Sequence, residues 1–140
     1  MEADGCRILL VEDDDADAFF FRRALDKAGF PGELIWKASP TEAWLALKEM
    51  EQPERLHLIL CDGMWAEDGA HDLLQWMRVH PVFGKVPFVV YSGALPPQRA
   101  AQMRHLGADL VLEKAGITEM SERLRPAFLL LPPACRAWLK

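Results

Sequence analysis

Polar side chains that could do chemistry follow four short apolar runs of the sequence. The carboxylates of Glu12 and Asp13 directly follow the first run, and Asp62 follows another. Ser92 ends a third run, and Lys114 lies just beyond the last. Because an unpaired charge is costly to bury, each of these positions either opens a solvent-exposed loop or belongs to a site.

These residue types together suit phosphoryl chemistry. Carboxylates a few Å apart repel one another by roughly 4 kcal/mol per pair at an effective dielectric constant of 20, so they stay ionised together only beside a cation. Hard oxygen ligands suit Mg²⁺, which also binds phosphate oxygens. A serine hydroxyl can donate to a phosphoryl oxygen, and an ammonium neutralises its charge. The set therefore indicates transfer of a phosphoryl group onto one carboxylate.

Each member also has a simpler explanation when it is taken alone. The acidic run 12–15 is typical of a helix start, where carboxylates favour the positive end of the helix dipole. Asp62 alone is typical of the first residue of a loop, Ser92 of a turn, and Lys114 of a solvated surface. The joint pattern is more specific than any member, because all of them fall at successive strand ends of one topology.

Short apolar runs alternate with longer amphipathic stretches along the chain. The alternation predicts an α/β fold, a parallel sheet with helices on both faces. Ligands of such sheets bind beyond the carboxyl ends of the strands, which is where the polar residues fall. We expect strands at 7–11, 34–37, 56–61, 87–91 and 110–112, and helices at 15–28, 40–50, 70–79, 97–106 and 117–131, the last interrupted by Pro126.

Composition excludes several classes of protein. The 140 residues suggest one domain, and the 51% of hydrophobic residues suffice for a core. A net charge of −5 argues against nucleic acid and against a membrane surface as partners. Apolar runs fall well short of the ~18 residues of a membrane span, and the acidic first residues are unlike a signal peptide.

The cysteines favour a reducing compartment. Cys6, Cys61 and Cys135 are odd in number and far apart in the sequence. We therefore expect neither a disulfide framework nor a zinc knuckle, and a cytoplasmic location.

Four segments resemble the receiver domain of two-component response regulators. They are "ILLVEDD" at 8–14, "LILCD" at 58–62, "PFVVYSGA" at 87–94 and "GADLVLEK" at 107–114. The run "VEDDDADAFFFRRAL" at 11–25 is particularly similar to small stand-alone receivers, including those paired with bacterial phytochrome kinases. The resemblance covers about 7–131 of a single domain, 1–140, with a tail at 132–140. It implies a flavodoxin-like (βα)5 three-layer sandwich with strand order 2-1-3-4-5.

The resemblance also implies roles for the polar residues. Asp62 is the expected phosphoacceptor, and Ser92 and Lys114 are the expected catalytic and switch residues that follow the phosphoryl group. The implied cofactor is Mg²⁺, with ligands Glu12, Asp13, Asp62 and the backbone carbonyl of Met64. A histidine kinase or histidine phosphotransfer protein is the implied donor, and a downstream protein the target. The chain would be no enzyme beyond self-phosphorylation and slow self-dephosphorylation.

The chain departs from the family pattern at several positions. The loop after Asp62 lacks the usual proline and is one residue shorter, which affects the expected carbonyl of Met64. Ala115 replaces a proline that is usually cis, so we expect either a trans bond or a strained exception. Val111 replaces the usual aromatic switch residue. Trp65 lies in the shortened loop, where it either shields the acyl phosphate or packs on the neighbouring helix.

The residues also allow other functions and arrangements. A pseudo-receiver would keep the fold as a phosphorylation-independent binding module. A phosphatase with an aspartyl nucleophile generally has a second aspartate two residues later, but Met64 stands there. Trp138 and Leu139 of the tail either pack on the body or form a homodimer. The start at Met1 and the tail favour a stand-alone protein over a receiver excised from a hybrid kinase.

Overall fold

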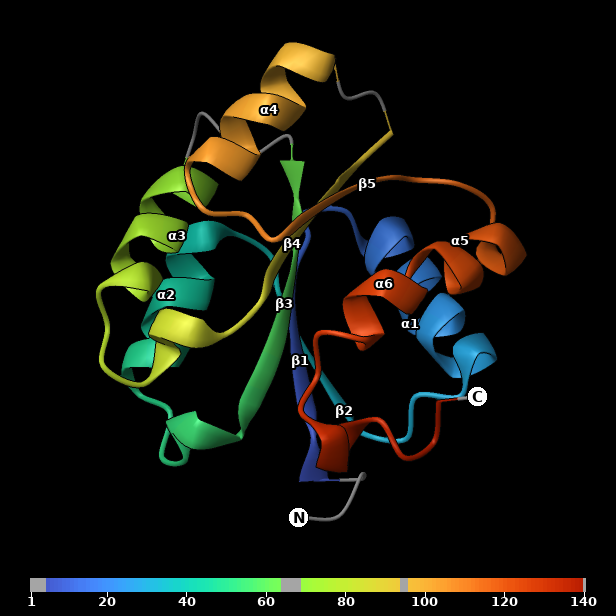
Figure 1. Cartoon of the computed structure of the whole chain (residues 1–140), viewed down its shortest axis with the longest axis horizontal. Coiled ribbons are helices and arrows are strands. Elements are labelled where there is room, and N and C mark those ends of the chain that lie inside the picture. The colour runs from blue at the N-terminus through green and yellow to red at the C-terminus, as the bar shows by residue number, and fades with distance from the viewer. Residues whose placement is uncertain (1–4, 64–68, 94–95, 140) are drawn as a thin grey trace.

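A computed structural model describes residues 5–63, 69–93 and 96–139, and its centre is a five-stranded parallel sheet (Figure 1). The strand order is β2-β1-β3-β4-β5, which confirms the order that the resemblance implied. Each predicted strand is present, with bounds that differ by at most one residue at either end. The strands are β1 Arg7–Val11, β2 Glu33–Lys37, β3 Leu56–Asp62, β4 Phe88–Ser92 and β5 Leu110–Glu113.

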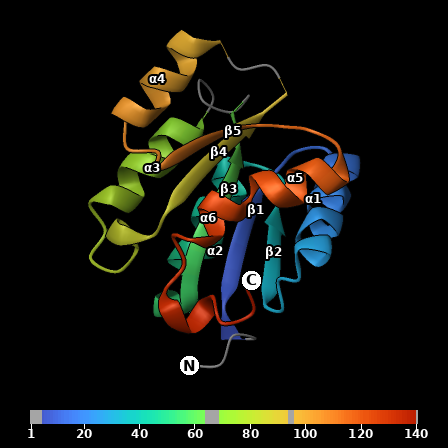
Figure 2. The same cartoon turned by 45° about the vertical axis from the view of Figure 1, so that its right-hand side comes forward.

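Helices cover both faces of the sheet, so the molecule has three layers. Helices α1, α5 and α6 lie on one face, and α2, α3 and α4 on the other (Figures 1 and 2). The interruption predicted within 117–131 is present, since this stretch forms two short helices and Pro126 has no N–H to donate to a continuous helix. The bounds are α1 Asp15–Ala28, α2 Pro40–Lys48, α3 His71–Arg78, α4 Pro97–His105, α5 Ile117–Arg123 and α6 Arg125–Phe128.

Local sequence signals fix where the first two helices begin and end. The Asp14 carboxylate accepts from the backbone N–H groups of Ala16 (2.7 Å) and Asp17 (3.1 Å), which caps α1. Gly29 ends α1 with φ of +92°, a conformation that favours glycine. Ser39 accepts from the backbone N–H of Glu42 at 3.1 Å and caps α2 as predicted. The cap at Asp14 therefore starts α1 directly after the acidic residues that follow β1.

Alternation along the strands divides the core into two parts. In β3, which is buried throughout, Leu58 and Leu60 join the core under α1, α5 and α6. Ile59 and Cys61 join the core under α2 and α3. The strand is thus apolar on both sides, as expected for a central parallel strand. The sheet is therefore anchored on both faces up to its carboxyl edge.

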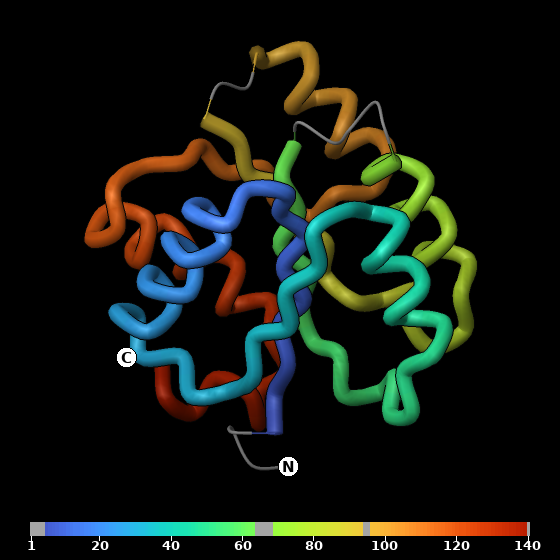
Figure 3. Tube along the Cα trace, turned by 180° about the vertical axis from the view of Figure 1, so that it is seen from behind, coloured from blue at the N-terminus to red at the C-terminus, as the bar shows by residue number. Residues whose placement is uncertain are grey.

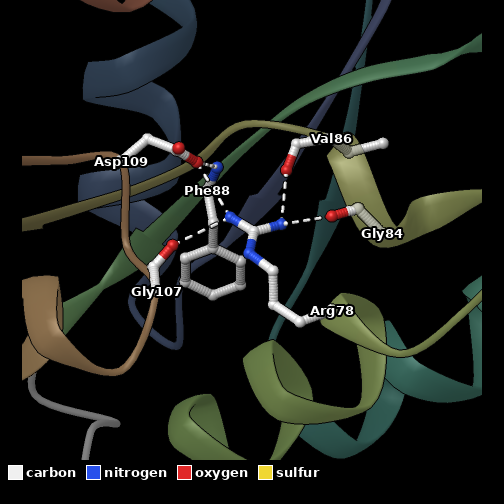
Figure 4. A network of polar contacts seen from close by, with 6 residues as sticks. All are labelled: Arg78, Gly84, Val86, Phe88, Gly107 and Asp109. Carbon is white, nitrogen blue, oxygen red and sulfur yellow. Dashed lines mark hydrogen bonds and ion pairs between the residues drawn. The ribbon is translucent and has the colours of Figure 1, made fainter.

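Arg78, the last residue of α3, connects this helix to the turn before β4 and to the loop after α4 (Figure 4). Its guanidinium donates to carbonyls on both the turn before β4 and the loop after α4, and it forms an ion pair with Asp109. Asp109 in turn accepts from the backbone N–H of Phe88 at 2.8 Å. The acceptors of Arg78 are the carbonyls of Gly84 (3.3 Å), Val86 (2.9 Å) and Gly107 (2.9 Å) and the Asp109 carboxylate (2.8 Å).

Cys6 and Cys135 form a disulfide, so the prediction that no disulfide would form was wrong. The residues are 129 positions apart in the sequence, yet their Cα atoms are 5.8 Å apart. The last segment of the chain returns to the start of β1, as the view from behind shows (Figure 3). Spacing along the sequence cannot reveal such a contact. The cysteine count therefore no longer supports a reducing compartment.

The tail packs on the body of the molecule. The ring centroid of Trp138 lies 4.9 Å from that of Phe128 and 5.7 Å from that of Phe30. Its indole N–H donates to the carbonyl of Cys135 at 2.6 Å. This is the packing role expected for Trp138, and the homodimer stays a prediction. Within the described ranges, no helix is both long and apolar enough to cross a bilayer.

Replacing Cys135 by serine should lower the free energy of unfolding. A disulfide that closes so long a loop typically contributes about 2–4 kcal/mol, chiefly by restricting the unfolded chain. The measurement is urea unfolding of the wild type and Cys135→Ser, each with and without a reducing agent. We expect reduction to destabilise the wild type and leave Cys135→Ser unchanged. Equal stability of oxidised wild type and variant would contradict a disulfide in solution.

Candidate functional site

The carboxyl ends of the central strands bring the predicted site residues to one edge of the sheet. Asp62 is the last residue of β3 and lies beside Tyr91 in the register of β3 and β4. Ser92 ends β4 and lies beside Glu113 of β5, directly before Lys114. The backbone N–H of Lys114 donates to the Ser92 carbonyl at 2.9 Å. The convergence expected from the topology is therefore present.

Three carboxylates form a cluster at this edge. Oxygen atoms of Glu12, Asp13 and Asp62 all lie within 4.8 Å of one another. Glu12 is 1% exposed and Asp62 9% exposed, whereas Asp13 is open to solvent. Oxygen ligands this close suit a divalent cation, which removes their mutual repulsion. The donor set fits the predicted metal site.

The buried carboxylate of Glu12 is held by donors on both oxygens. The Tyr91 hydroxyl donates to Oε1 at 2.7 Å, and the backbone N–H of Asp14 donates to Oε2 at 3.0 Å. The indole N–H of Trp36 donates to the Glu12 carbonyl at 2.7 Å. Sequence reasoning missed Tyr91 and Trp36 as supports of the site. The available signal was that the only tyrosine of the chain lies next to the end of an otherwise apolar strand.

Burial raises the pKa of Glu12 to about 7, well above its ordinary value of 4.5. The hydrogen bonds from Tyr91 and Asp14 partly offset this rise, and the negative charge of Asp62 adds to it. Burial and the neighbouring carboxylates also raise the pKa of Tyr91 far above its usual range. The phenol therefore remains a hydrogen-bond donor to Glu12 at any physiological pH.

A cavity of about 340 Å³ opens at the strand ends beside the cluster. Its wall combines carboxylates, one phenol, one hydroxyl and one ammonium. A side chain at Gly63 would crowd its neighbours, since a Cβ there would lie 3.0 Å from Val90 Cγ1 and 3.4 Å from Ser92 Cβ. The lining residues are Glu12, Asp17, Asp62, Tyr91, Ser92, Gly93 and Lys114.

Lys114 reaches across the site to α1. Its ammonium forms an ion pair with the carboxylate of Asp17 and lies 5.1 Å from the centroid of the Phe20 ring. Lys114 was predicted to belong to the site, whereas Asp17 was not. A signal was present, since Asp17 lies in the first turn of the helix that follows the acidic run.

The departures from the family pattern have different outcomes. The Lys114–Ala115 bond is trans, one of the two outcomes expected, as are the other peptide bonds of the described residues. Val111 packs partly buried against the core under α2 and α3. Met64 and Trp65 lie outside the described residues, so the expected carbonyl ligand and the shielding role stay predictions.

Among the comparisons with known proteins, the one with solved structures supports the fold. No protein-family model matches the sequence, and no curated protein is significantly similar to it. Among solved structures, the response regulator RPA3017 in red light signalling of R. palustris superposes with a TM-score of 0.77 at 12% identity, over 92% of this chain and 95% of that one. The Mn²⁺-bound response regulator Rcp1 superposes with a TM-score of 0.74 at 24% identity, over 91% of this chain and 99% of that one.

A third structure, the phosphorylated cyanobacterial phytochrome response regulator RcpA, gives a TM-score of 0.72 at 21% identity, over 87% of this chain and 90% of that one. All three are response regulators. The likeness confirms the flavodoxin-like receiver fold expected from the sequence motifs.

The raised pKa of Glu12 predicts a pH-dependent stability in the absence of metal. Its stabilising contribution is complete below pH 4.5 and is lost as pH rises through 7, because the folded state binds the proton more tightly than the unfolded state. Between pH 5.5 and pH 8 the loss should be about 1–2 kcal/mol, from roughly 1.4 kcal/mol per pKa unit. Urea unfolding at both pH values in a chelator measures it.

Glu12→Gln is the control for this prediction. Burial, with the charges of Arg55 and Arg7, lowers the pKa of His57, which acts in the opposite direction over the same pH range. The difference between wild type and Glu12→Gln removes that contribution. An identical pH dependence of the two proteins would contradict a raised pKa at Glu12.

Proposed function

We propose that this chain is a response-regulator receiver and that Asp62 accepts a phosphoryl group from a phosphohistidine. The observation that carries the proposal is the cavity at the strand ends, where Asp62 shares one wall with further carboxylates, the Ser92 hydroxyl and the Lys114 ammonium. Each of these groups has a use in phosphoryl transfer. The receiver fold and the solved neighbours named above support the same signalling role.

Glu12, Asp13 and Asp62 would hold a divalent cation, which we take to be Mg²⁺. The cation would supply positive charge that neutralises the carboxylates and the phosphoryl oxygens. A neighbour of the same fold was solved with Mn²⁺ bound. The close oxygen atoms of the three carboxylates support such a site in this chain. The backbone carbonyl of Met64 is proposed as a further ligand.

Transfer begins with attack by an Asp62 carboxylate oxygen on phosphorus. A phosphorus–oxygen bond forms as the phosphorus–nitrogen bond of the donor histidine breaks. The imidazole nitrogen keeps the electron pair and takes up a proton. The product is an acyl phosphate, and water later cleaves it to return the carboxylate and inorganic phosphate. The chain would thus act on itself and turn over no separate substrate.

The added group brings roughly −1.5 to −2 charges to the site. Ser92 would donate its hydroxyl to a phosphoryl oxygen, and Lys114 would pair with another. Since Ser92 ends β4 and Lys114 follows β5, their movement would bias the surface formed by α4, β5 and α5 between two states. That surface would bind the downstream protein. The donor would be a histidine kinase or phosphotransfer protein in the cytoplasm.

One observation favours a second candidate, a pseudo-receiver that binds its partner without phosphorylation. The ion pair that Lys114 makes within the described residues is with Asp17. A lysine that stays paired with Asp17 would leave a phosphoryl group on Asp62 without its cationic partner. The two candidates differ in whether Asp62 can be phosphorylated.

Incubation with acetyl phosphate and Mg²⁺ should add the mass of one phosphoryl group to the intact protein. The gain should disappear in a chelator and in Asp62→Asn, because both the cation and the carboxylate nucleophile are needed. Ser92→Ala, which keeps the nucleophile, should still be phosphorylated. A folded wild type that gains no mass from acetyl phosphate or from a phosphohistidine donor would favour the pseudo-receiver.

A further inference from the structure

The ion pair between Asp17 and Lys114 is a feature that the phosphoryl-transfer scheme does not use. The Lys114 ammonium contacts Oδ1 of Asp17, and the Phe20 ring lies beside it at 5.1 Å. The lysine side chain is 24% exposed and that of Asp17 38%. The Lys114 side chain is therefore held against α1 by Asp17 and is not a freely solvated surface lysine.

The same lysine has a competing anion within the cavity. Asp17, Asp62 and Lys114 all line it. An ammonium that turned to Asp62 would compete with a divalent cation for the carboxylate cluster. An ammonium that stays on Asp17 leaves the cluster to the cation. Addition of a phosphoryl group at Asp62 then raises the negative charge on one side of the lysine only.

We propose that Asp17 is a positioning residue that holds Lys114 on α1 before phosphorylation, keeps the carboxylate cluster available to a divalent cation, and yields the lysine to the phosphoryl group. The release step rests on the proposed function, whereas the holding step does not. Because the pair is partly exposed, its loss should change binding by only about two- to five-fold.

Mn²⁺ affinity of the full-length, unphosphorylated protein tests the holding step. We expect Asp17→Asn to weaken Mn²⁺ binding about two- to five-fold, since the released ammonium competes at Asp62. In a Lys114→Met background the same substitution should have little effect. Asp17→Glu should restore binding.

Asp15→Asn is the matched control, because it removes the same charge from the same turn of α1. Asp15 is exposed and does not line the cavity. If Asp17→Asn weakens Mn²⁺ binding equally with and without Lys114, or no more than Asp15→Asn does, simple loss of charge explains the effect and the inference is wrong.

Binding of beryllium fluoride, a phosphoryl analogue, at saturating Mn²⁺ tests the release step. Asp17→Asn should bind the analogue about two- to five-fold more tightly than the wild type, because no ion pair has to break. Unchanged affinity would overturn the release step. A wild type that is neither phosphorylated nor bound by the analogue would refute the proposed function, and the Mn²⁺ comparison would still decide the holding step. A wild type that binds no Mn²⁺ would overturn both.

Discussion

The burial of like charges at one edge of the sheet is the constraint on which the rest of the structure depends. Glu12 is almost fully buried beside Asp62, and burial of a carboxylate is unfavourable. Tyr91 and the backbone N–H of Asp14 recover part of that cost through hydrogen bonds. The remainder must come from elsewhere in the fold. The apolar cores on both faces of the sheet, together with the Cys6–Cys135 disulfide, provide that stability at a distance from the site.

The parallel register of the strands fixes the relative positions of the residues at this edge. Each strand ends with a residue whose place is set by its neighbour, so Asp62 lies beside Tyr91 and Ser92 beside Glu113. The Tyr91 side chain links β4 to the carboxylate that follows β1. A shift of one residue in any of these strands would move its side chain to the other face of the sheet. The site is therefore as precise as the packing of the strands.

The sequence predicted what depends on local pattern and missed what depends on distant contacts. The bounds of the strands were predicted closely, because each strand is a short apolar run bounded by polar or turn residues, as with Leu56–Asp62. The convergence of Glu12, Asp62, Ser92 and Lys114 followed from the topology of parallel strands. The disulfide was missed because its residues are 129 positions apart. Asp17 was missed because a lysine's choice among nearby carboxylates depends on side-chain geometry, which strand order does not specify.

The two faces of the sheet differ in how firmly they are held, and this difference indicates where a signal can move the molecule. On one face the disulfide and Trp138 tie the tail to the core under α1, α5 and α6. On the other face α4 buries little more than Ala100 and Met103, and among the described residues no side chain caps its first turn at Pro96. Elements with few buried apolar residues open at the least cost. Since α4 follows the strand that ends at Ser92, a change in charge at Asp62 acts next to a helix with few buried apolar residues.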